Sequence, residues 1–168
     1  TKQQAEKLVE YCKYKPEGKR GLAFDIAHDS YERFLKKDNN AIGLTSIESK
    51  MKQINESIVI IPLIETELGI RNCEKIVSVP GIDMAWLGHY DLTDSLNIVG
   101  EFENKKFWNS VEIFLNACSK NNKPAGIIDL NIPFLEKLKK KGFTVIGLGH
   151  EIAFLQDAIH DKLEIIKR

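Results

Sequence analysis

The chain has 168 residues, of which 43% are hydrophobic and 29% are charged, and its 24 acidic residues balance its 24 lysines and arginines. These proportions are ordinary for a chain that buries one core, so we expect residues 1–168 to form a single domain. A formal net charge of zero gives no field that would attract nucleic acid or an anionic membrane surface. The sequence therefore excludes both of these partner classes and predicts that function resides in a local site.

Three further features predict a cytoplasmic protein. No apolar run approaches the roughly 20 residues of a membrane span, and the first residues lack the charged-then-apolar plan of a secretion signal. Cys12, Cys73 and Cys118 are odd in number, form no C-x-x-C pair and fall within helical patterns. We therefore expect three reduced, buried or half-buried thiols rather than a disulfide framework.

The N-terminal part of the chain is predicted to be mainly helical. Thr1 to Gln4 form a capping box that opens a helix, so we expect the chain to start within a larger architecture and to be a fragment. Residues 14–21 read as a Pro/Gly turn, and residues 22–40 as helix and loop without clear periodicity. A second capping box at Thr45 to Glu48 predicts a helix over residues 45–55.

From residue 57 onward, strands and helices are predicted to alternate. Near-continuous apolar runs are typical of parallel strands covered by helices, and they occur near residues 58–64, 82–87, 125–129 and 143–148. Helical patterns occur between and after them, near residues 66–78, 104–121, 131–141 and 151–167. The fold class is therefore α/β. Four such units are half of a (β/α)₈ barrel of about 250 residues, whereas an open doubly wound sheet could be complete at this length.

Two carboxylates follow neighbouring predicted strands. Glu65 closes the first strand, and Asp91 follows the second after the turn at residues 88–90. Carboxyl ends of parallel strands meet at one edge, so the two side chains could share a hard cation such as Mg²⁺ or Mn²⁺, with waters completing its shell. The alternative is structural: Glu65 could cap a helix that starts at Thr66, and Asp91 could cap a turn at residues 92–94.

Other polar residues are weaker candidates. His89 and His150 follow strand ends and could act as a general base, although solvated loop histidines are the more ordinary interpretation. His28 and His160 read as surface helix residues, and Asp83 opens a strand at the opposite edge of the sheet. Asp129 reads as a loop or capping residue before Asn131. None of the four predicted strands contains a lysine, which argues against a Schiff-base mechanism.

Several short motifs occur in a family-like order and spacing. They are L-I-E-T-E-L-G at residues 63–69, G-I-D at 81–83 and L-G-H-Y-D-L-T at 87–93, and the similarity continues through residues 14–21, 123–127 and 142–149. Together they resemble the HpcH/HpaI aldolase and citrate lyase β family over nearly the whole chain. The resemblance implies a (β/α)₈ barrel of the phosphoenolpyruvate/pyruvate type, of which this chain would be the C-terminal half.

The resemblance also implies a function. Glu65 and Asp91 would be the metal ligands, and Gly88, Tyr90 and Asp91 would bind a 2-oxo acid substrate, the last two through their backbone N–H groups. A Mg²⁺ or Mn²⁺ ion would stabilise the enolate formed when a carbon–carbon bond breaks. The implied enzyme is a class II aldolase, a homo-oligomer that cleaves a 4-hydroxy-2-oxo acid to pyruvate and an aldehyde.

The chain also departs from the family pattern. Leu63 replaces a glutamine common in aldolases and is typical of citrate-lyase-like members, whereas the spacing from Asp91 to Gly126 favours aldolases. Tyr90, which replaces a smaller residue, is expected to narrow the pocket. The family's proton-transferring His and Asp and its Arg belong to earlier strands, so no catalytic base is expected in this chain. A citrate-lyase-like acyl-CoA lyase and a non-catalytic fragment therefore remain alternatives.

The final predicted helix and the sheet edges bear on assembly. A half-barrel would expose two edge strands and should associate with other chains. Apolar residues recur on one face of the last helix, which could pack on another subunit or on its own sheet: Ile152, Leu155, Ile159, Leu163 and Ile166.

Overall fold

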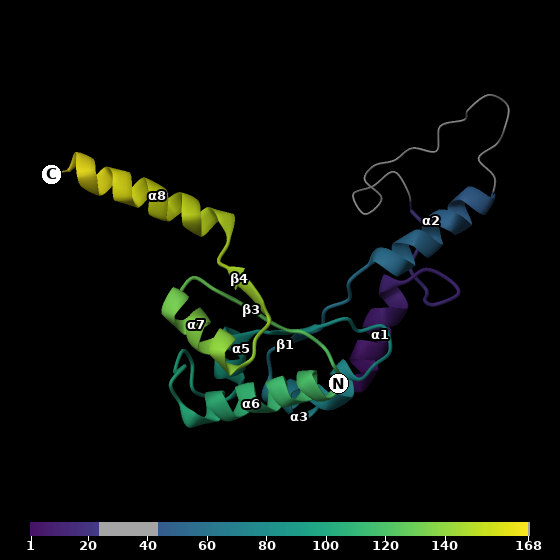
Figure 1. Ribbon diagram of the computed structural model, residues 1–168, viewed down its shortest axis with the longest axis horizontal. Coiled ribbons are helices and arrows are strands. Elements are labelled where there is room, and N and C mark those ends of the chain that lie inside the picture. Colours follow the sequence, from purple (N-terminus) through teal and green to yellow (C-terminus); the bar gives the residue numbers. More distant parts are fainter. Residues whose placement is uncertain (24–43, 168) are drawn as a thin grey trace.

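The computed structural model describes residues 1–23 and 44–167, with side chains from residue 48 in the second range. In these ranges, after the first two helices, each strand is followed by one or two helices (Figure 1). Their order is α1 (Lys2–Cys12), α2 (Leu44–Ser57), β1 (Leu63–Ile64), α3 (Glu67–Arg71), α4 (Cys73–Val77), β2 (Ala85–Leu87), α5 (His89–Ser95), α6 (Lys105–Lys120), β3 (Ala125–Asp129), α7 (Ile132–Lys141), β4 (Val145–Leu148) and α8 (Glu151–Ile166).

The strands form one parallel sheet in the order β1-β2-β3-β4. The register pairs Ile64 with Leu87, and Trp86 with Gly126 in the next strand. All four predicted strands are confirmed, although β1 is shorter than expected. Ahead of β1 the chain still runs alongside the next strand, because the Asp83 N–H donates to the Ile60 carbonyl at 3.0 Å.

The sheet has two unlike faces, because successive strand residues point to opposite sides. Ile64, Leu87 and Ile127 point to the helix-covered face, where they are at most 2% exposed. On the other side, called here the inner face, Leu63 is 54% exposed and Ile128 is 37% exposed. The core therefore lies between the sheet and its helices, and the inner face is largely uncovered.

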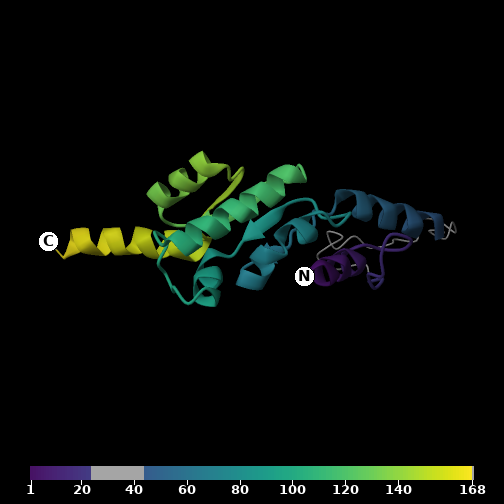
Figure 2. The same cartoon turned by 90° about the horizontal axis from the view of Figure 1, so that it is seen from below.

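Helices α4, α6 and α7 supply most of the helix side of this core, and α6 lies along the sheet (Figure 2). Phe107, Val111 and Phe114 of α6 are each at most 1% exposed, as helical spacing on one face requires. Helix α7 begins with Asn131 as its N-cap, and Gly142 ends it with a φ of 125°. These local signals agree with the sequence prediction for residues 131–141.

Two elements differ from the sequence prediction. The helix expected over residues 66–78 is divided into α3 and α4 at Asn72. Helix α5 was expected only as a turn, because its seven residues, HYDLTDS, show too little apolar periodicity to mark a helix. The expectation for residues 22–40 and the position of His28 fall almost wholly outside the described residues.

The cysteine prediction is confirmed. All three thiols are free, with Cys73 and Cys118 buried and Cys12 half-buried. Burial raises the pKa of the Cys73 thiol to about 12, with smaller contributions from Cys118 and Glu74. Burial likewise raises the pKa of the Cys118 thiol to about 11. Both are therefore neutral core side chains at physiological pH.

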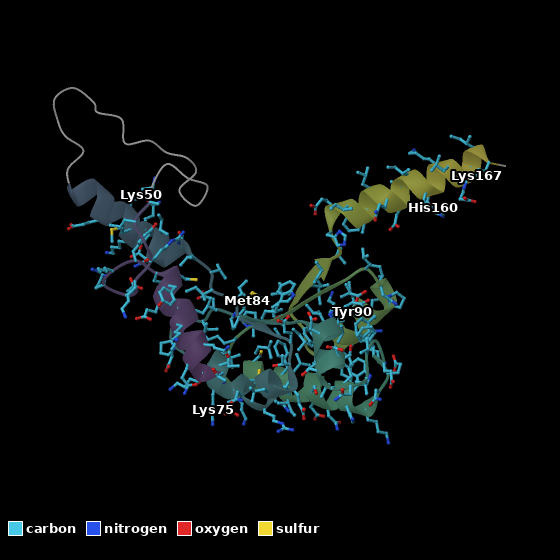
Figure 3. The ribbon with its side chains drawn as sticks, turned by 180° about the vertical axis from the view of Figure 1, so that it is seen from behind. Lys50, Lys75, Met84, Tyr90, His160 and Lys167 are labelled. Atoms are coloured by element: carbon cyan, nitrogen blue, oxygen red, sulfur yellow. The ribbon has the colours of Figure 1, made fainter. Side chains whose placement is uncertain are left out.

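Helix α8 projects away from the rest of the chain (Figure 1). Its side chains, including His160 and Lys167 near its end, stand clear of the other elements in the view from behind (Figure 3). Ala153 is its one buried residue, whereas Leu155 is 62% exposed and Ile159 is 49% exposed. The alternative that this helix packs on its own sheet is therefore wrong. Its packing on another subunit stays a prediction.

Among the helices in the described ranges, none is long and apolar enough to cross a membrane.

Candidate functional site

Glu65 lies on the inner face, directly beside Gly88. A Cβ placed on Gly88 would lie 2.7 Å from the Glu65 Cβ and 3.0 Å from its Oε2, which shows how closely the two residues approach. The cap of α3 is Thr66, whose Oγ1 accepts the Gly69 N–H at 3.0 Å. The capping role considered for Glu65 is therefore wrong, and its carboxylate is left available.

Asp91 lies in the first turn of α5, which follows β2 directly. Gly88 is the N-cap of this helix, and the Leu92 N–H donates to the Gly88 carbonyl at 3.0 Å. The turn cap considered for Asp91 is thus wrong as well, because the residue is already inside a helix. Its side chain is exposed.

No positively charged side chain neutralises these two carboxylates within the described parts of the chain. Neither Glu65 nor Asp91 has a hydrogen bond or ion pair there, whereas nearby Glu67 pairs with Arg71. Two unpaired carboxylates after adjacent strands create a local concentration of negative charge. This charge has the sign that a cation site requires.

The turns that carry the two carboxylates are joined to each other by hydrogen bonds. The Gly88 N–H donates to the Ile64 carbonyl at 3.0 Å, which ties the start of α5 to the end of β1. The Glu67 N–H donates to Ser95 Oγ at 3.0 Å, which ties the β1–α3 turn to the end of α5. These two hydrogen bonds therefore fix the separation of the two segments.

His89, the first residue of α5, is buried rather than solvated. Its side chain is 6% exposed, and its Nε2 lies 2.7 Å from Oδ2 of Asp129 at the end of β3. Its ring centroid lies 5.3 Å from that of Phe102 and 5.8 Å from that of Phe134. The interpretation of His89 as a solvated loop residue is therefore wrong. Nothing in the residues next to it, such as Gly88, indicated that aromatic rings pack against it.

The other polar candidates are structural or exposed. His150 is the exposed N-cap of α8, and its Nδ1 accepts the Ala153 N–H at 3.3 Å. His160 is exposed on α8, as expected. Asp83 accepts the Ile60 N–H at 2.7 Å near the amino ends of the strands, where it braces the sheet. Asp129 is the last residue of β3, and Asn131 is the N-cap of α7, so the loop or capping role expected for Asp129 is wrong. Its Oδ1 accepts the Asn131 N–H at 2.6 Å.

A pocket of about 460 Å³ lies beside the α5 turn. The Tyr90 ring borders it and meets Phe102 edge-on, with ring centroids 5.1 Å apart. Figure 3 shows Tyr90 on α5. The other walls of the pocket include Asp129, Asn131, Phe134 and Lys137. The sequence did not reveal this pocket, since its walls come from three segments far apart in the chain.

The donor set at the edge of the sheet suits a hard cation. In the described ranges, no group of three or more His, Cys, Asp or Glu side chains converges as a preformed metal cage. Mg²⁺ commonly binds through one or two carboxylates and keeps several waters or substrate oxygens, so two carboxylates are sufficient. Glu65 and Asp91 therefore fit such an ion and do not form a closed structural site.

Comparison with known proteins places the chain in a family. The pattern of the family HpcH/HpaI aldolase/citrate lyase matches residues 1–158. A 5-keto-4-deoxy-D-glucarate aldolase from Shigella boydii is 24% identical over 168 residues, which are 100% of this chain and 60% of that protein. The chain thus spans somewhat less than two thirds of the length of this curated relative.

Two solved structures share the fold. An HpcH/HpaI aldolase from Desulfitobacterium hafniense DCB-2 has a TM-score of 0.79 and 21% identity, over 100% of this chain and 61% of that one. An HpcH/HpaI aldolase/citrate lyase family protein from Burkholderia cenocepacia J2315 has a TM-score of 0.82 and 19% identity, over 100% and 62% respectively. The parallel sheet and its helices are accordingly half of a (β/α)₈ barrel rather than an open sheet. The chain belongs to the HpcH/HpaI aldolase/citrate lyase family.

Proposed function

We propose that this single domain provides the cation- and substrate-binding part of a divalent-metal-dependent carbon–carbon lyase. The reaction would cleave a 4-hydroxy-2-oxo acid to pyruvate and an aldehyde. The observation that carries the proposal is the pair of carboxylates, Glu65 and Asp91, which have no protein partner among the described residues and belong to turns joined by hydrogen bonds.

Glu65 and Asp91 would hold Mg²⁺ or Mn²⁺, which when bound stabilises negative charge on a keto oxygen. The backbone would hold the substrate's own carboxylate. In the first turn of α5 the N–H groups of Tyr90 and Asp91 precede the first intrahelical bond, which Leu92 makes, and they have no partner among the described residues. Such N–H groups suit an anionic oxygen.

The proposed substrate class is supported by a relative from the family. The Shigella boydii relative is named for an aldolase that acts on a hydroxylated oxo acid. We therefore favour a small, hydroxylated 2-oxo acid.

An acyl-CoA lyase of the citrate-lyase type is the second candidate, and Leu63 favours it. The Leu63 Cδ1 lies 3.4 Å from where a Gly88 Cβ would be, so an apolar group borders Glu65. Leu63 provides no side-chain amide that could orient a small polar substrate.

An aldol cleavage assay tests the proposed function. The purified chain is incubated with a 4-hydroxy-2-oxo acid and Mg²⁺ or Mn²⁺, and pyruvate release is followed with a coupled dehydrogenase. Metal-dependent release that Glu65→Ala abolishes would support the lyase proposal. Cleavage of an acyl-CoA substrate alone would favour the second candidate. Metal binding without any turnover would favour the non-catalytic alternative for this chain, and absence of metal binding would overturn the proposal.

We also propose that the chain forms a homo-oligomer through α8. Leu155 and Ile159 lie one turn apart on a helix with no covering element among the described residues. Sedimentation of the wild-type chain should show an oligomer, and Leu155→Glu with Ile159→Glu should shift it to smaller species. Gln156→Glu, an exposed change on the same helix, should have no effect. A wild-type chain that sediments as a monomer would contradict the proposal.

A further inference from the structure

A buried polar pair joins the start of α5 to the end of β3. The side chains of His89 and Asp129 are 6% and 8% exposed, and Nε2 of the histidine lies 2.7 Å from Oδ2 of the aspartate. The second carboxylate oxygen, Oδ1, accepts the Asn131 N–H at 2.6 Å. Both oxygens of Asp129 are therefore used inside the protein.

This pair does not lie on the face that carries Glu65. Alternation along β3 places Asp129 on the same side as Ile127, which is fully buried against the helices. Glu65 and Leu63 approach Gly88 on the inner face. His89 is thus poorly placed to exchange a proton with a substrate held at Glu65, which argues against the general-base role considered for it.

The His89–Asp129 pair holds in place the turn that carries Asp91. On the β1 side, the Gly88 N–H bonds to the Ile64 carbonyl. On the β3 side, His89 bonds to Asp129 and packs against the Phe102 and Phe134 rings. Asp91 follows two residues later in the same helical turn, so its backbone is anchored to both neighbouring strands.

We propose that His89 and Asp129 are positioning residues that fix Asp91 relative to Glu65 and thereby set the affinity of the cation site. This inference rests on the proposed function of those two carboxylates. Removal of either partner leaves the other buried without its hydrogen bond. The free-energy cost of burying an unpaired polar group then favours a shift of the α5 turn. Outer residues that orient a ligand typically account for about 10- to 100-fold in metal affinity.

Mn²⁺ binding tests the proposal without any assay of turnover. Titration of the full chain, followed by calorimetry or by the electron paramagnetic resonance signal of free Mn²⁺, gives both a dissociation constant and a number of sites. Asp129→Asn, which keeps the shape of the side chain, and His89→Ala should each weaken Mn²⁺ binding by about 10- to 100-fold. The double variant should be little worse than either single one, because the two residues act as one unit.

The controls separate positioning from a loss of folding. Unfolded molecules lower the number of sites, whereas a displaced Asp91 raises the dissociation constant of the folded ones. His89→Gln, which can still donate to Asp129, should recover most of the affinity, and His160→Ala on exposed α8 should match the wild type. Asp129→Asn decides the outcome if His89→Ala does not fold.

The outcomes also separate this inference from the proposed function. If the wild type fails to bind Mn²⁺, or binds it equally well after Glu65→Gln, the metal site itself is refuted. If Glu65→Gln abolishes binding while Asp129→Asn and His89→Ala bind with wild-type affinity, the metal site stands and the positioning role is overturned.

Discussion

Glu65→Gln is expected to weaken Mn²⁺ binding by about 100-fold or more, which corresponds to about 2.7 kcal/mol. The change removes the negative charge from one of two proposed ligands and keeps the side-chain shape. Glu65 has no ion pair among the described residues, so its replacement breaks no stabilising contact. We therefore expect the melting temperature to be unchanged or slightly raised, because repulsion between the two carboxylates is relieved. Mn²⁺ titration and thermal melting measure the two effects.

The matched control is Glu67→Gln, two residues away in the same segment. Glu67 pairs with Arg71 at the surface, and exposed pairs contribute little to stability. This variant should bind Mn²⁺ with wild-type affinity. Equal loss of affinity in both variants would point to a general charge effect rather than to coordination by Glu65.

Gly88→Ala should weaken Mn²⁺ binding although it removes no carboxylate. The added Cβ would lie 2.7 Å from the Glu65 Cβ, a distance that requires one of the two residues to move. The φ of Gly88 is −87°, which alanine adopts without strain, so the clash with Glu65 is the main effect. We expect a loss of about 10- to 100-fold in affinity, the range typical of disturbed ligand geometry, measured by the same titration.

Gly21→Ala is the control for this second variant, because among the described residues no atom beyond its two chain neighbours lies within 4 Å of a Cβ at that position. It should leave Mn²⁺ affinity and stability nearly unchanged. If Gly88→Ala also binds Mn²⁺ with wild-type affinity, the close approach of Glu65 to Gly88 is not what positions the ligand.

The regular part of the fold could be predicted because local patterns and tertiary structure agree there. Buried parallel strands leave continuous apolar runs such as A-G-I-I-D at residues 125–129, and α7 carries both an Asn cap and a terminal Gly. The two carboxylates could also be placed, because the end of a parallel strand is a defined place in this architecture. Family motifs distinguish the barrel from an open sheet, which could be complete at this chain length.

The features that escaped prediction are those set by contacts between distant segments. The burial of His89 depends on Asp129, 40 residues away, and on the rings of Phe102 and Phe134. Helix α5 is too short for its periodicity to be visible. The exposure of α8 could not be read from its sequence either, because an apolar helix face looks the same whether it packs on its own sheet or on another subunit.

Anomalous diffraction from crystals of the chain grown with Mn²⁺ tests the cation site most directly. We predict one strong peak at the inner face, about 2.1 Å from carboxylate oxygens of both Glu65 and Asp91, with waters filling the remaining positions. A peak that contacts only one of the two residues, a peak elsewhere in the chain, or no peak at saturating Mn²⁺ would contradict the site.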